Sequence, residues 1–594
     1  MSQVGTTEIV GEVGVLTIDY PPVNALSAHT RIALDEGFRA FAADDRVKAI
    51  VLICAGRTFI AGADISEFGK PSTGPNMLEV FDRIENGAKP VVAAIHGTAL
   101  GGGFETALIC HYRIAVPSAR IGLPEVALGL LPGGGGTQRL PRIVGIPAAL
   151  DLITGGAPVS ATKALELGMI DALAEEGRLR EDAIAFAARL VAEKCPLLRV
   201  RDRQDPVGPY RGKPEIYAEY LAKNARAFRG FKAPFNIVKA IEAAAELPFE
   251  QGILRERELF GELMTSTESA AQRYYFFAER EAAKVPDLPK DTPVRPFKSV
   301  GVIGAGTMGG GIAMNFLNAG VPVTLVEMNQ AALDRGSGVI RKTYETTAAK
   351  GRMTAAQVEQ RMALLTPALG LEALADADLV IEAVFEEIGV KQDVFARLDG
   401  VAKPGAILAS NTSFLDLDAI AAATSRAQSV VGLHFFSPAD VMRLLEIVRG
   451  AATSNEALAT ALKIAKAIGK VPVVSRVGPG FIANRVMGSH SRQVIDLFLE
   501  GPTPLDVDQA IVARLLYPVV NEGAKVLDEG VAIRASDIDV ACILGYNWPV
   551  YTGGPMFWAD IVGLPEVVEG LRAVGIEPAR LLAEKAVSGG SFTR

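Results

Sequence analysis

The chain of 594 residues has little of what marks exported, disulfide-bonded or nucleic-acid-binding proteins. It has four cysteines, too far apart for a C-x-x-C pair or a dense disulfide framework: Cys54, Cys110, Cys195 and Cys542. We expect reduced thiols in the interior of the protein, and no motif predicts a metal site. The net charge is -8 and no Lys/Arg run is long enough to follow a phosphate backbone, which argues against a nucleic-acid partner.

Signals for export or membrane insertion are also lacking. Residues 1–19 carry Glu8 and Glu12 and do not show the basic-then-apolar order of a secretory signal, so we expect no export. Residues 300–326 have no charge over a length that could cross a bilayer. The glycines between Gly301 and Gly320 favour a strand-turn-helix unit instead, so we predict no membrane span.

Composition and patterning predict several globular domains. Hydrophobic residues make up 49% and charged residues 22%, as in folded soluble proteins. The length is several times the usual domain size of about 100 to 150 residues. Apolar runs alternate with helical patterns up to about Ala192, which indicates an α/β domain with predicted strands at residues 14–18, 49–54 and 90–95.

Helical patterning returns after a loop-rich connection, over residues 215–284, and a proline-rich linker then leads to a second α/β domain. The strands predicted there are residues 298–303, 321–326, 379–384, 407–410 and 430–433. A weak repeat with an offset of 29 residues follows, in which residues 485–501 correspond to 514–530. The predicted divisions are 1–192, 193–284, 285–297, 298–477, 478–512 and 513–594.

A glycine-rich segment and two glutamates form the first candidate site. Gly101 to Gly103 open a predicted helix, whose free N–H groups could stabilise a developing enolate oxygen. Glu105 falls one turn into that helix, and Glu125 follows twenty residues later. Hydration of an unsaturated thioester needs one group to activate water and another to deliver a proton, which two glutamates can supply. Either glutamate alone would most often be a solvated surface residue.

Together with residues 59–65 and 131–140, this pattern resembles the crotonase family, specifically enoyl-CoA hydratases, over about residues 8–190. The resemblance implies a ClpP/crotonase-like spiral fold with oxyanion-hole donors at the backbone N–H groups of Ala63 and Gly102. It also implies that Glu105 and Glu125 are the catalytic pair. The presence of both favours hydration, while movement of a double bond by an enoyl-CoA isomerase activity stays open.

A nucleotide-binding turn opens the second candidate site. A predicted strand runs into the segment Gly304-Ala305-Gly306-Thr307-Met308-Gly309, and the next strand ends at Glu327, 23 residues after Gly304. A lone glycine turn would be a weak signal, but this one lies between a strand and a helix. A carboxylate at Glu327 would bind an adenosine ribose and repel a 2′-phosphate, so NAD is favoured over NADP.

Polar residues at later strand ends supply a candidate base. Ser413 follows one predicted strand and His434 follows another, on the crevice side of such a sheet. Oxidation of a secondary alcohol needs a base for the hydroxyl proton, and histidine has a suitable pKa. Glu446, 12 residues on, could orient His434. The remaining histidines, which have no comparable setting, are His29, His96, His111 and His490.

Residues 298–512 resemble 3-hydroxyacyl-CoA dehydrogenases, which implies a Rossmann NAD-binding domain followed by a helical C-terminal domain. In that resemblance His434 is the base and Glu446 its partner. Ser413 donates a hydrogen bond to the substrate oxygen and Asn484 is a positioning residue. The implied NAD contacts are Gly304, Gly306, Met308, Gly309, Glu327, Glu386 and Lys391. The order of the two halves matches multifunctional enzyme type 1 and the bacterial fatty-acid oxidation α-subunits.

The C-terminal region departs from that family, whose members usually carry two complete copies of the helical unit. Here the first copy passes directly, after residues 506–512, into residues 515–518, which resemble the middle of the second copy. The second copy, with residues 545–549 and 553–556, either rebuilds one hybrid unit or leaves an impaired dehydrogenase. We favour the hybrid, because a deletion between equivalent points of two repeats can preserve the local fold.

The sequence therefore predicts a multidomain α/β enzyme of fatty-acid β-oxidation that hydrates trans-2-enoyl-CoA and oxidises the product with NAD. Two alternatives stay open: a hydratase or isomerase whose second half is a structural or nucleotide-binding module, and a noncatalytic NAD-sensing or assembly protein. We expect acyl-CoA substrates, a monomer or small oligomer, and a thiolase partner. A bacterial chain is expected in the cytoplasm and a eukaryotic one in peroxisomes, although the sequence does not end in a peroxisomal tripeptide.

Overall fold

The computed structural model describes residues 4–71, 73–500 and 512–593, and the chain divides into two compact units, residues 1–273 and 274–594. The end of the predicted first repeat copy, with Asp506 and Asp508, lies outside the described residues. Within the described ranges, no helix combines the length and apolar character needed to cross a membrane. The uncharged residues 300–326 form a strand, a helix and part of a second strand. All four cysteines are free thiols.

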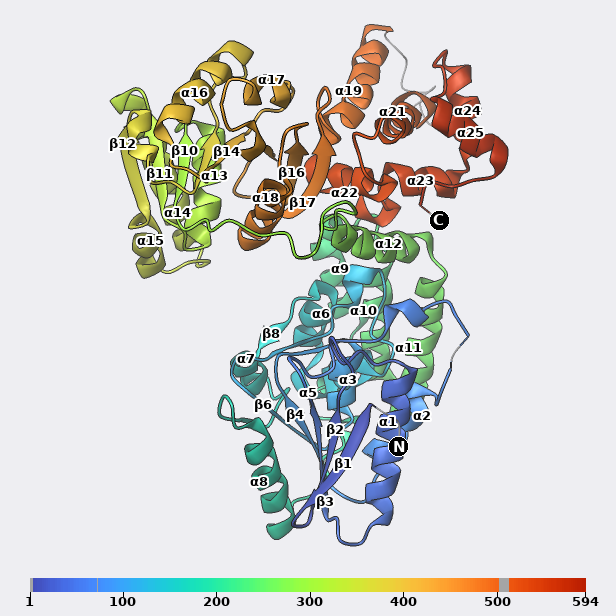
Figure 1. Cartoon of the computed structure of the whole chain (residues 1–594). Helices are drawn as coiled ribbons and strands as arrows, with labels where there is room; N and C mark the ends of the chain where they lie inside the picture. The colour runs from blue at the N-terminus through green and yellow to red at the C-terminus, as the bar shows by residue number, and fades with distance from the viewer. Residues whose placement is uncertain (1–3, 72, 501–511, 594) are drawn as a thin grey trace. The chain divides into compact units, whose positions relative to one another are not determined.

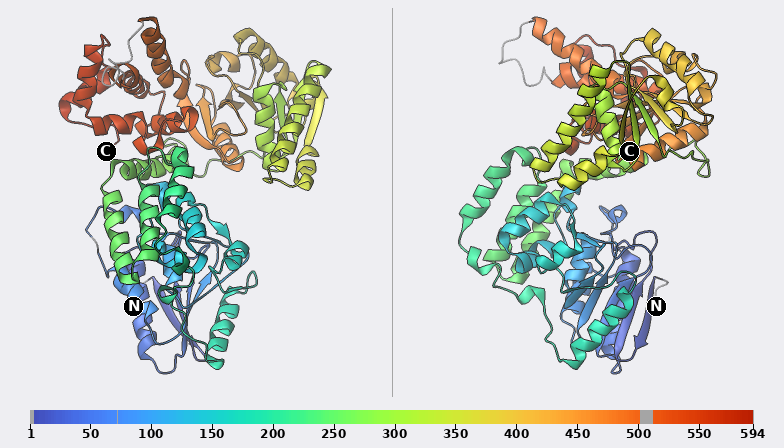
Figure 2. Two further views of the ribbon diagram at one scale, coloured as in Figure 1. Left: turned by 180° about the vertical axis from the view of Figure 1, so that it is seen from behind. Right: turned by 90° about the vertical axis from the view of Figure 1, so that its left-hand side faces the viewer.

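The first unit is built on a six-stranded sheet in the order β1-β2-β3-β4-β6-β9, in which only the β1–β2 pair is antiparallel. Every residue of the two central strands is buried, as expected for parallel strands covered on both faces. Helix α8 (Leu179–Ala192) packs across the strands (Figure 2). The strands are β1 (Gly5–Val10), β2 (Val13–Ile18), β3 (Ala49–Cys54), β4 (Val91–Ile95), β6 (Tyr112–Ala115) and β9 (Ala172–Leu173).

A second, three-stranded sheet positions the first glycine-rich helix. Its strands are β5 (Thr98–Leu100), β7 (Arg120–Gly122) and β8 (Val159–Ser160). The chain passes from β4 to β5 and again from β6 to β7, so it winds between the two sheets. Helix α3 (Gly102–Leu108) begins at the glycine cluster, as the sequence predicts, but it follows β5, a strand that was not predicted.

The predicted helical extension consists of α9 (Pro214–Phe228), α10 (Ala233–Glu246), α11 (Phe249–Met264) and α12 (Thr267–Glu281). Helices α10 and α11 pack on the short helix α4 (Gly136–Arg139). The buried stripe of α11 has helical spacing and consists of Phe249, Gly252, Glu256, Leu259 and Leu263. One member of this otherwise apolar stripe is a glutamate, which α11 thereby carries into the core.

The second unit contains an eight-stranded sheet in the order β12-β11-β10-β13-β14-β15-β16-β17, parallel except at the β15–β16 pair. Five of its strands were predicted, with ends within two residues: β10 (Val300–Ile303), β11 (Val323–Glu327), β13 (Leu379–Glu382), β14 (Ile407–Ser410) and β15 (Val430–Phe435). The sequence analysis missed β12 (Leu365–Leu369), β16 (Leu444–Arg449) and β17 (Val471–Arg476). Strand β15 extends past its predicted end because it pairs with β16.

Two hydrophobic cores cover the two faces of this sheet. One contains α13 (Thr307–Asn318), α14 (Gln330–Ala349) and α18 (Asn455–Ala467). The other contains α16 (Ile388–Val401) and α17 (Leu417–Ala421). In Figure 1, α16 and α17 lie above the sheet and α14 and α18 below it. The predicted doubly wound sheet is confirmed by this arrangement.

The C-terminal helices of the two predicted repeat copies share one core. Helix α19 (Ala483–Glu500) packs on α21 (Tyr517–Asp528) and α22 (Ala535–Tyr546) (Figure 1). The core joins Ile482 and Val486 of the first copy to Val519 and Val526 of the second. Arg485 of α19 forms ion pairs of 2.8 and 2.6 Å with Glu522 and Glu529. The described parts of both copies thus pack as one helical body, which also includes α23 (Pro555–Val562), α24 (Leu564–Ala573) and α25 (Arg580–Ser588).

Candidate active sites

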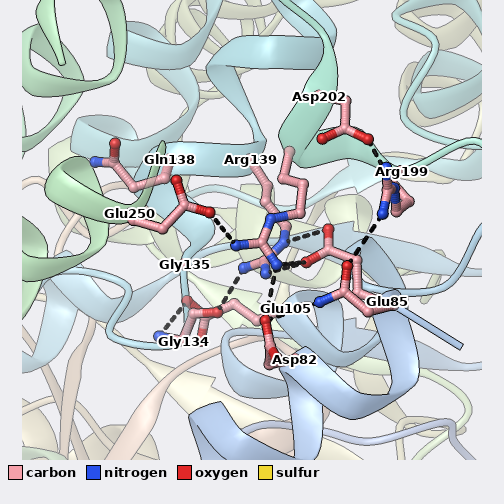
Figure 3. Close-up of polar contacts among 12 residues, drawn as sticks. Asp82, Glu85, Glu105, Gly134, Gly135, Gln138, Arg139, Arg199, Asp202 and Glu250 are labelled. Carbon is pink, nitrogen blue, oxygen red and sulfur yellow. Dashed lines mark hydrogen bonds and ion pairs between the residues drawn. The ribbon is translucent and has the colours of Figure 1, made fainter. Parts of the chain in front are cut away.

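A glycine-rich loop holds the first predicted carboxylate. The Oε1 atom of Glu105, a residue that is 3% exposed, accepts a hydrogen bond from the N–H group of Gly134 at 2.7 Å (Figure 3). It accepts a second from the N–H group of Gly136 at 2.8 Å. A Cβ atom on Gly134 would lie 2.7 Å from Glu105 Oε2, and one on Gly136 would lie 2.9 Å from Oε1. Larger residues would therefore displace the carboxylate from the loop.

In the described part of the chain the glycine-rich loop does not hold the second predicted carboxylate, on which a backbone N–H of Glu125 itself acts. Glu125 opens a short 3-10 helix, Glu125–Leu128, and its buried Oε2 atom has no hydrogen-bond partner among the described residues. At Gly101, where φ is +52°, a Cβ atom would lie 3.0 Å from Glu125 Oε1. The glycine therefore lets the Glu125 carboxylate approach the N-terminus of α3, where Glu105 also lies.

The two predicted oxyanion-hole donors are neighbours. Gly102 is the first residue of α3, so its N–H group has no acceptor within the helix. A Cβ atom on Gly102 would lie 3.4 Å from the backbone nitrogen of Ala63. The geometry thus brings both N–H groups to the same end of α3 as the two glutamates.

A third buried carboxylate, which the sequence analysis missed, binds the same loop. Glu256 of α11 accepts hydrogen bonds from the N–H of Gly135 (2.7 Å) and from the N–H (3.0 Å) and hydroxyl (2.5 Å) of Thr137. The N–H groups of residues 134 to 137 therefore alternate between Glu105 and Glu256. An acidic residue in the apolar stripe of a predicted helix was the signal that could have found Glu256.

The opposite side of the loop is fixed by a buried ion pair. Arg139 donates to both carboxylate oxygens of Glu85, at 3.0 and 2.6 Å, and its Nη1 donates to the carbonyl oxygen of Gly134 at 3.1 Å (Figure 3). Both partners are buried. Bidentate pairs of this kind restrict geometry as well as add energy.

The hydrogen-bond environments separate the two catalytic candidates electrostatically. Desolvation raises the pKa of Glu105, but the N–H groups of Gly136 and Gly134 oppose this by stabilising its charged form. Desolvation raises the pKa of Glu125 well above its ordinary value, and the charge of Glu105 adds to the rise. Desolvation, followed by the charge of Glu105, also raises the pKa of Glu256 to about 8. The pKa of Glu105 is raised less than that of Glu125, so of the two carboxyl groups Glu105 is the first to lose its proton as pH rises.

In the second unit, the predicted nucleotide-binding turn fits a dinucleotide. Gly306 precedes α13, and a Cβ atom on Gly309 would lie 1.8 Å from the carbonyl oxygen of Gly304, so the helix can approach the strand only with glycine there. Glu327 ends β11, and its Oε1 accepts a hydrogen bond from Ala305 N–H at 3.0 Å. A cavity of about 570 Å³ is lined by Gly306, Glu327 and neighbouring residues. Met308, the second residue of α13, packs partly buried against the core.

The other two predicted NAD contacts, exposed Glu386 and buried Lys391, belong to one network at the ends of β13 and β14. Lys391 is 1% exposed, and its Nζ lies 2.7 Å from Glu382 Oε1 and 3.2 Å from Glu386 Oε2. Glu386 Oε1 accepts hydrogen bonds from the Thr412 hydroxyl and the Ser413 N–H, each at 2.6 Å. Although desolvation acts to raise it, these donors hold the pKa of Glu386 below its ordinary value. The network thus fixes the backbone at Ser413.

Strand pairing brings the predicted base and its partner together. His434 and Glu446 are opposite each other in the antiparallel β15–β16 pair, with 2.7 Å between Nδ1 and Oε2. The sequence analysis wrongly placed His434 beyond the end of its strand and missed the strand that carries Glu446. Glu446 Oε1 accepts hydrogen bonds from Ile482 N–H (3.2 Å) and Ala483 N–H (2.9 Å), which docks the start of α19.

Asn484 lies beside this pair on the second position of α19. Its Nδ2 donates to the carbonyl oxygen of Ser413 at 3.4 Å, so the predicted positioning residue meets the predicted hydrogen-bond donor to the substrate. Its Oδ1 accepts a 2.5 Å hydrogen bond from the hydroxyl of Tyr546, which the sequence analysis quoted only within a second-copy motif. A cavity of about 500 Å³ is lined by Phe414, Asn484 and residues of α19 and α21.

Comparisons with known proteins cover both units. Residues 8–201 match the enoyl-CoA hydratase/isomerase family, and residues 299–477 match the 3-hydroxyacyl-CoA dehydrogenase, NAD binding domain family. A solved structure of (S)-3-hydroxybutyryl-CoA dehydrogenase PaaH1 from Ralstonia eutropha is 31% identical, with coverage of 50% of this chain and 95% of that chain and a TM-score of 0.33.

Two relatives align over nearly the whole chain. The peroxisomal bifunctional enzyme of Danio rerio is 37% identical over 98% of this chain and 96% of its own length. That alignment has 702 positions, more than the 594 residues here, so the relative has stretches without a counterpart in this chain. The peroxisomal fatty acid beta-oxidation multifunctional protein AIM1 of Arabidopsis thaliana is 34% identical over 99% of this chain and 98% of its own length. The chain therefore belongs to the family of bifunctional fatty-acid β-oxidation enzymes that join an enoyl-CoA hydratase to an NAD-dependent 3-hydroxyacyl-CoA dehydrogenase.

Proposed function

We propose that this bifunctional enzyme hydrates trans-2-enoyl-CoA with Glu105 and Glu125 and oxidises the resulting 3-hydroxyacyl-CoA with His434 as the base. The first assignment rests on the different hydrogen-bond partners of the two carboxylates. Glu105 receives two N–H donors, whereas the buried Oε2 atom of Glu125 has no partner among the described residues.

In the hydration step, charged Glu105 takes a proton from water as the water oxygen bonds to the β-carbon. Protonated Glu125 then delivers its proton to the α-carbon. The N–H groups of Ala63 and Gly102 stabilise the negative charge that develops on the thioester oxygen between these events. Glu256 helps to position Glu105 indirectly, because it binds the N–H groups of Gly135 and Thr137 in the loop that also binds Glu105.

In the oxidation step, His434 accepts the proton of the 3-hydroxyl group. Its Nδ1 faces Glu446, so Nε2 is left to accept the proton. The Glu446 carboxylate then stabilises the positive charge that forms on the imidazole ring. The Ser413 hydroxyl donates to the substrate oxygen and Asn484 positions the substrate. A bound NAD would supply the acceptor for the hydride that leaves the carbon bearing this hydroxyl group.

The residues at the glycine turn and the adjoining strand ends would hold that cofactor. Gly304, Gly306 and Gly309, with Met308 beside them, would hold the diphosphate at the N-terminus of α13, and Glu327 would bind the adenosine ribose. Glu386 and Lys391 stand at the next strand ends and keep Ser413 in place.

We also propose the finer division of the chain, in which residues 298–477 bind NAD and the helices of both repeat copies form one hybrid cover over the acyl-CoA. The shared core and the ion pairs of Arg485 support this reading. The enzyme would act as a monomer or small oligomer and pass 3-oxoacyl-CoA to a thiolase. Light scattering and co-purification with a thiolase test these points.

The place of action is a proposal by analogy with the relatives. The Danio rerio and Arabidopsis thaliana relatives are both named as peroxisomal proteins. A eukaryotic chain of this kind would act in peroxisomes and a bacterial one in the cytoplasm. Fractionation of the source cell, with activity measured in each fraction, tests this assignment.

The test of the two activities is incubation with a 2-enoyl-CoA, first without NAD and then with it. In the first stage, without NAD, the conjugated double bond should be lost. In the second stage, after NAD is added, NADH should form. Hydration without any later NADH formation would contradict the second half of the proposal. NADH formation from added 3-hydroxyacyl-CoA without hydration would contradict the first.

A further inference from the structure

We propose that Tyr546 is a positioning residue of the dehydrogenase site, which fixes the side-chain amide of Asn484 so that one N–H of its Nδ2 group faces the substrate. The inference rests on the proposed role of Asn484 and extends it. It adds a residue from the second repeat copy to a site whose other members precede that copy in the chain.

The Asn484 amide is held at both ends. The phenol hydroxyl of Tyr546 donates to Oδ1 at 2.5 Å, and Nδ2 donates to the carbonyl oxygen of Ser413 at 3.4 Å. An amide nitrogen carries two N–H donors, so one remains for a substrate oxygen. The contact to Ser413 is long, so the shorter contact to Tyr546 contributes more to fixing the amide.

Rotation of the amide by half a turn would exchange its oxygen and nitrogen. The oxygen would then face the carbonyl oxygen of Ser413, and both groups accept hydrogen bonds. The substrate would meet an acceptor where it needs a donor. The Ser413 carbonyl, which can only accept, therefore disfavours this second orientation, and the Tyr546 hydroxyl, which donates to Oδ1, holds the amide in the productive one.

The position of Tyr546 follows from the packing of α22 against the sheet. At Gly545 a Cβ atom would lie 2.9 Å from Leu444 Cδ2 and 3.1 Å from Phe436 Cε1, so a larger residue would push the end of the helix away. The ring of Tyr546 lies edge-on to that of Phe436, with centroids 6.2 Å apart. Phe436 in turn lies 4.4 Å from the ring of His434. Tyr546 and His434 thus both pack against the ring of Phe436.

The phenol also stays a donor over the working pH range. Desolvation and the nearby charge of Glu446 both raise the pKa of Tyr546. The second copy therefore supplies a neutral hydroxyl at a fixed place beside the site. This gives the shortened C-terminal region a chemical task beyond covering the substrate.

The test compares Tyr546→Phe, Asn484→Ala and the double variant in the full-length enzyme. Tyr546→Phe keeps the ring packing and removes only the hydroxyl. We expect it to lower kcat/KM for 3-hydroxyacyl-CoA by about tenfold, the effect of losing one oriented hydrogen bond. The double variant should be no slower than Asn484→Ala, because Tyr546 acts only through Asn484.

Hydration and NAD affinity, measured on the same preparations, should not change. Tyr517→Phe is the matched control, since it removes a hydroxyl from another tyrosine of the same helical body, whose ring centroid lies 5.9 Å from that of Trp558. We expect this variant to oxidise 3-hydroxyacyl-CoA at the wild-type rate.

Three outcomes would overturn the inference. If Asn484→Ala is slow and Tyr546→Phe is as fast as wild type, the positioning role is wrong and the proposed site stands. If the losses of the two single variants multiply in the double variant, Tyr546 does not act through Asn484. If Asn484→Ala itself is as fast as wild type, the proposed role of Asn484 fails together with the inference.

Discussion

The two proposed active sites of this enzyme are held in different ways. In the hydratase, backbone N–H groups of one short loop position the Glu105 carboxylate, and the loop is fixed by Glu256 and Arg139. In the dehydrogenase, groups from five different elements must meet to form the site. They lie on, or directly after, β14, β15, β16, α19 and α22. The first site therefore depends on glycines in a local segment, whereas the second depends on long-range packing that includes the C-terminal region.

This difference predicts that each site can be broken without the other. The largest effect is expected for His434→Ala, which removes the base and leaves the Glu446 carboxylate buried without its partner. NADH formation should fall by about 10⁴-fold, the upper end of the range for loss of a general base, while hydration continues. His29→Ala, a change at an exposed histidine of α1 (Ala28–Ala43), is the control and should leave NADH formation intact. Measurable oxidation at near wild-type rate in His434→Ala would remove His434 from the mechanism.

The corresponding change in the hydratase is Glu105→Gln or Glu125→Gln. Each should lower hydration by roughly 10² to 10⁴-fold because a general acid or base is lost. Oxidation of supplied 3-hydroxyacyl-CoA should persist in the same samples. Glu181→Gln, at an exposed position of α8, controls for loss of a carboxylate as such. Near-normal hydration in both site variants would refute the assignment.

Cofactor choice should show a smaller effect. The Glu327 carboxylate would face the 2′-phosphate of NADP, and like charges repel, so kcat/KM should be lower with NADP than with NAD by roughly tenfold or more. Glu327→Gln should narrow that gap, chiefly by improving use of NADP. Equal turnover of the wild-type enzyme with both cofactors would contradict the ribose-binding role.

The smallest effect is expected for Glu256→Gln, which leaves both catalytic glutamates in place. A glutamine cannot accept at both ends, so the loop should loosen and hydration should fall by about tenfold. The charge of Glu256 contributes to the raised pKa of Glu125. Its removal should lower that pKa, so the loss of hydration at high pH, where Glu125 gives up its proton, should begin at lower pH.

Dehydrogenase activity serves as the internal control for Glu256→Gln and should keep its rate. The pH profile of hydration separates an electrostatic role from a purely structural one. If hydration is reduced but the alkaline limb of its pH profile does not shift, the role of Glu256 is only to hold the loop.

Much of both sites was predictable because short motifs carry them. The turn at Gly304 to Gly309 and the glutamate at 327 lie on adjoining elements, and Glu105 follows its own glycines. His434 and Glu446 were paired from their spacing of 12 residues and then from the resemblance, although the strand that carries Glu446 was missed. Strand β16 is buried along nearly its whole length and lacks an alternating pattern, so its period gave little signal.

Glu256 and Tyr546 could not be predicted in the same way. Glu256 binds a loop 121 residues earlier, and Tyr546 binds a residue 62 positions earlier. No local pattern encodes such contacts, because they arise only when helices from distant segments pack. The helical stripe of α11 at most shows that Glu256 is buried, not which groups it meets.

The central claim is that the shortened chain contains a complete dehydrogenase beside its hydratase. The most direct test measures NAD affinity and NADH formation on one wild-type preparation, with 3-hydroxyacyl-CoA substrates of several chain lengths. We predict NAD binding together with oxidation of at least one chain length. Tight NAD binding and normal hydration with no oxidation of any substrate would contradict the hybrid cover and leave the chain a hydratase with a nucleotide-binding module.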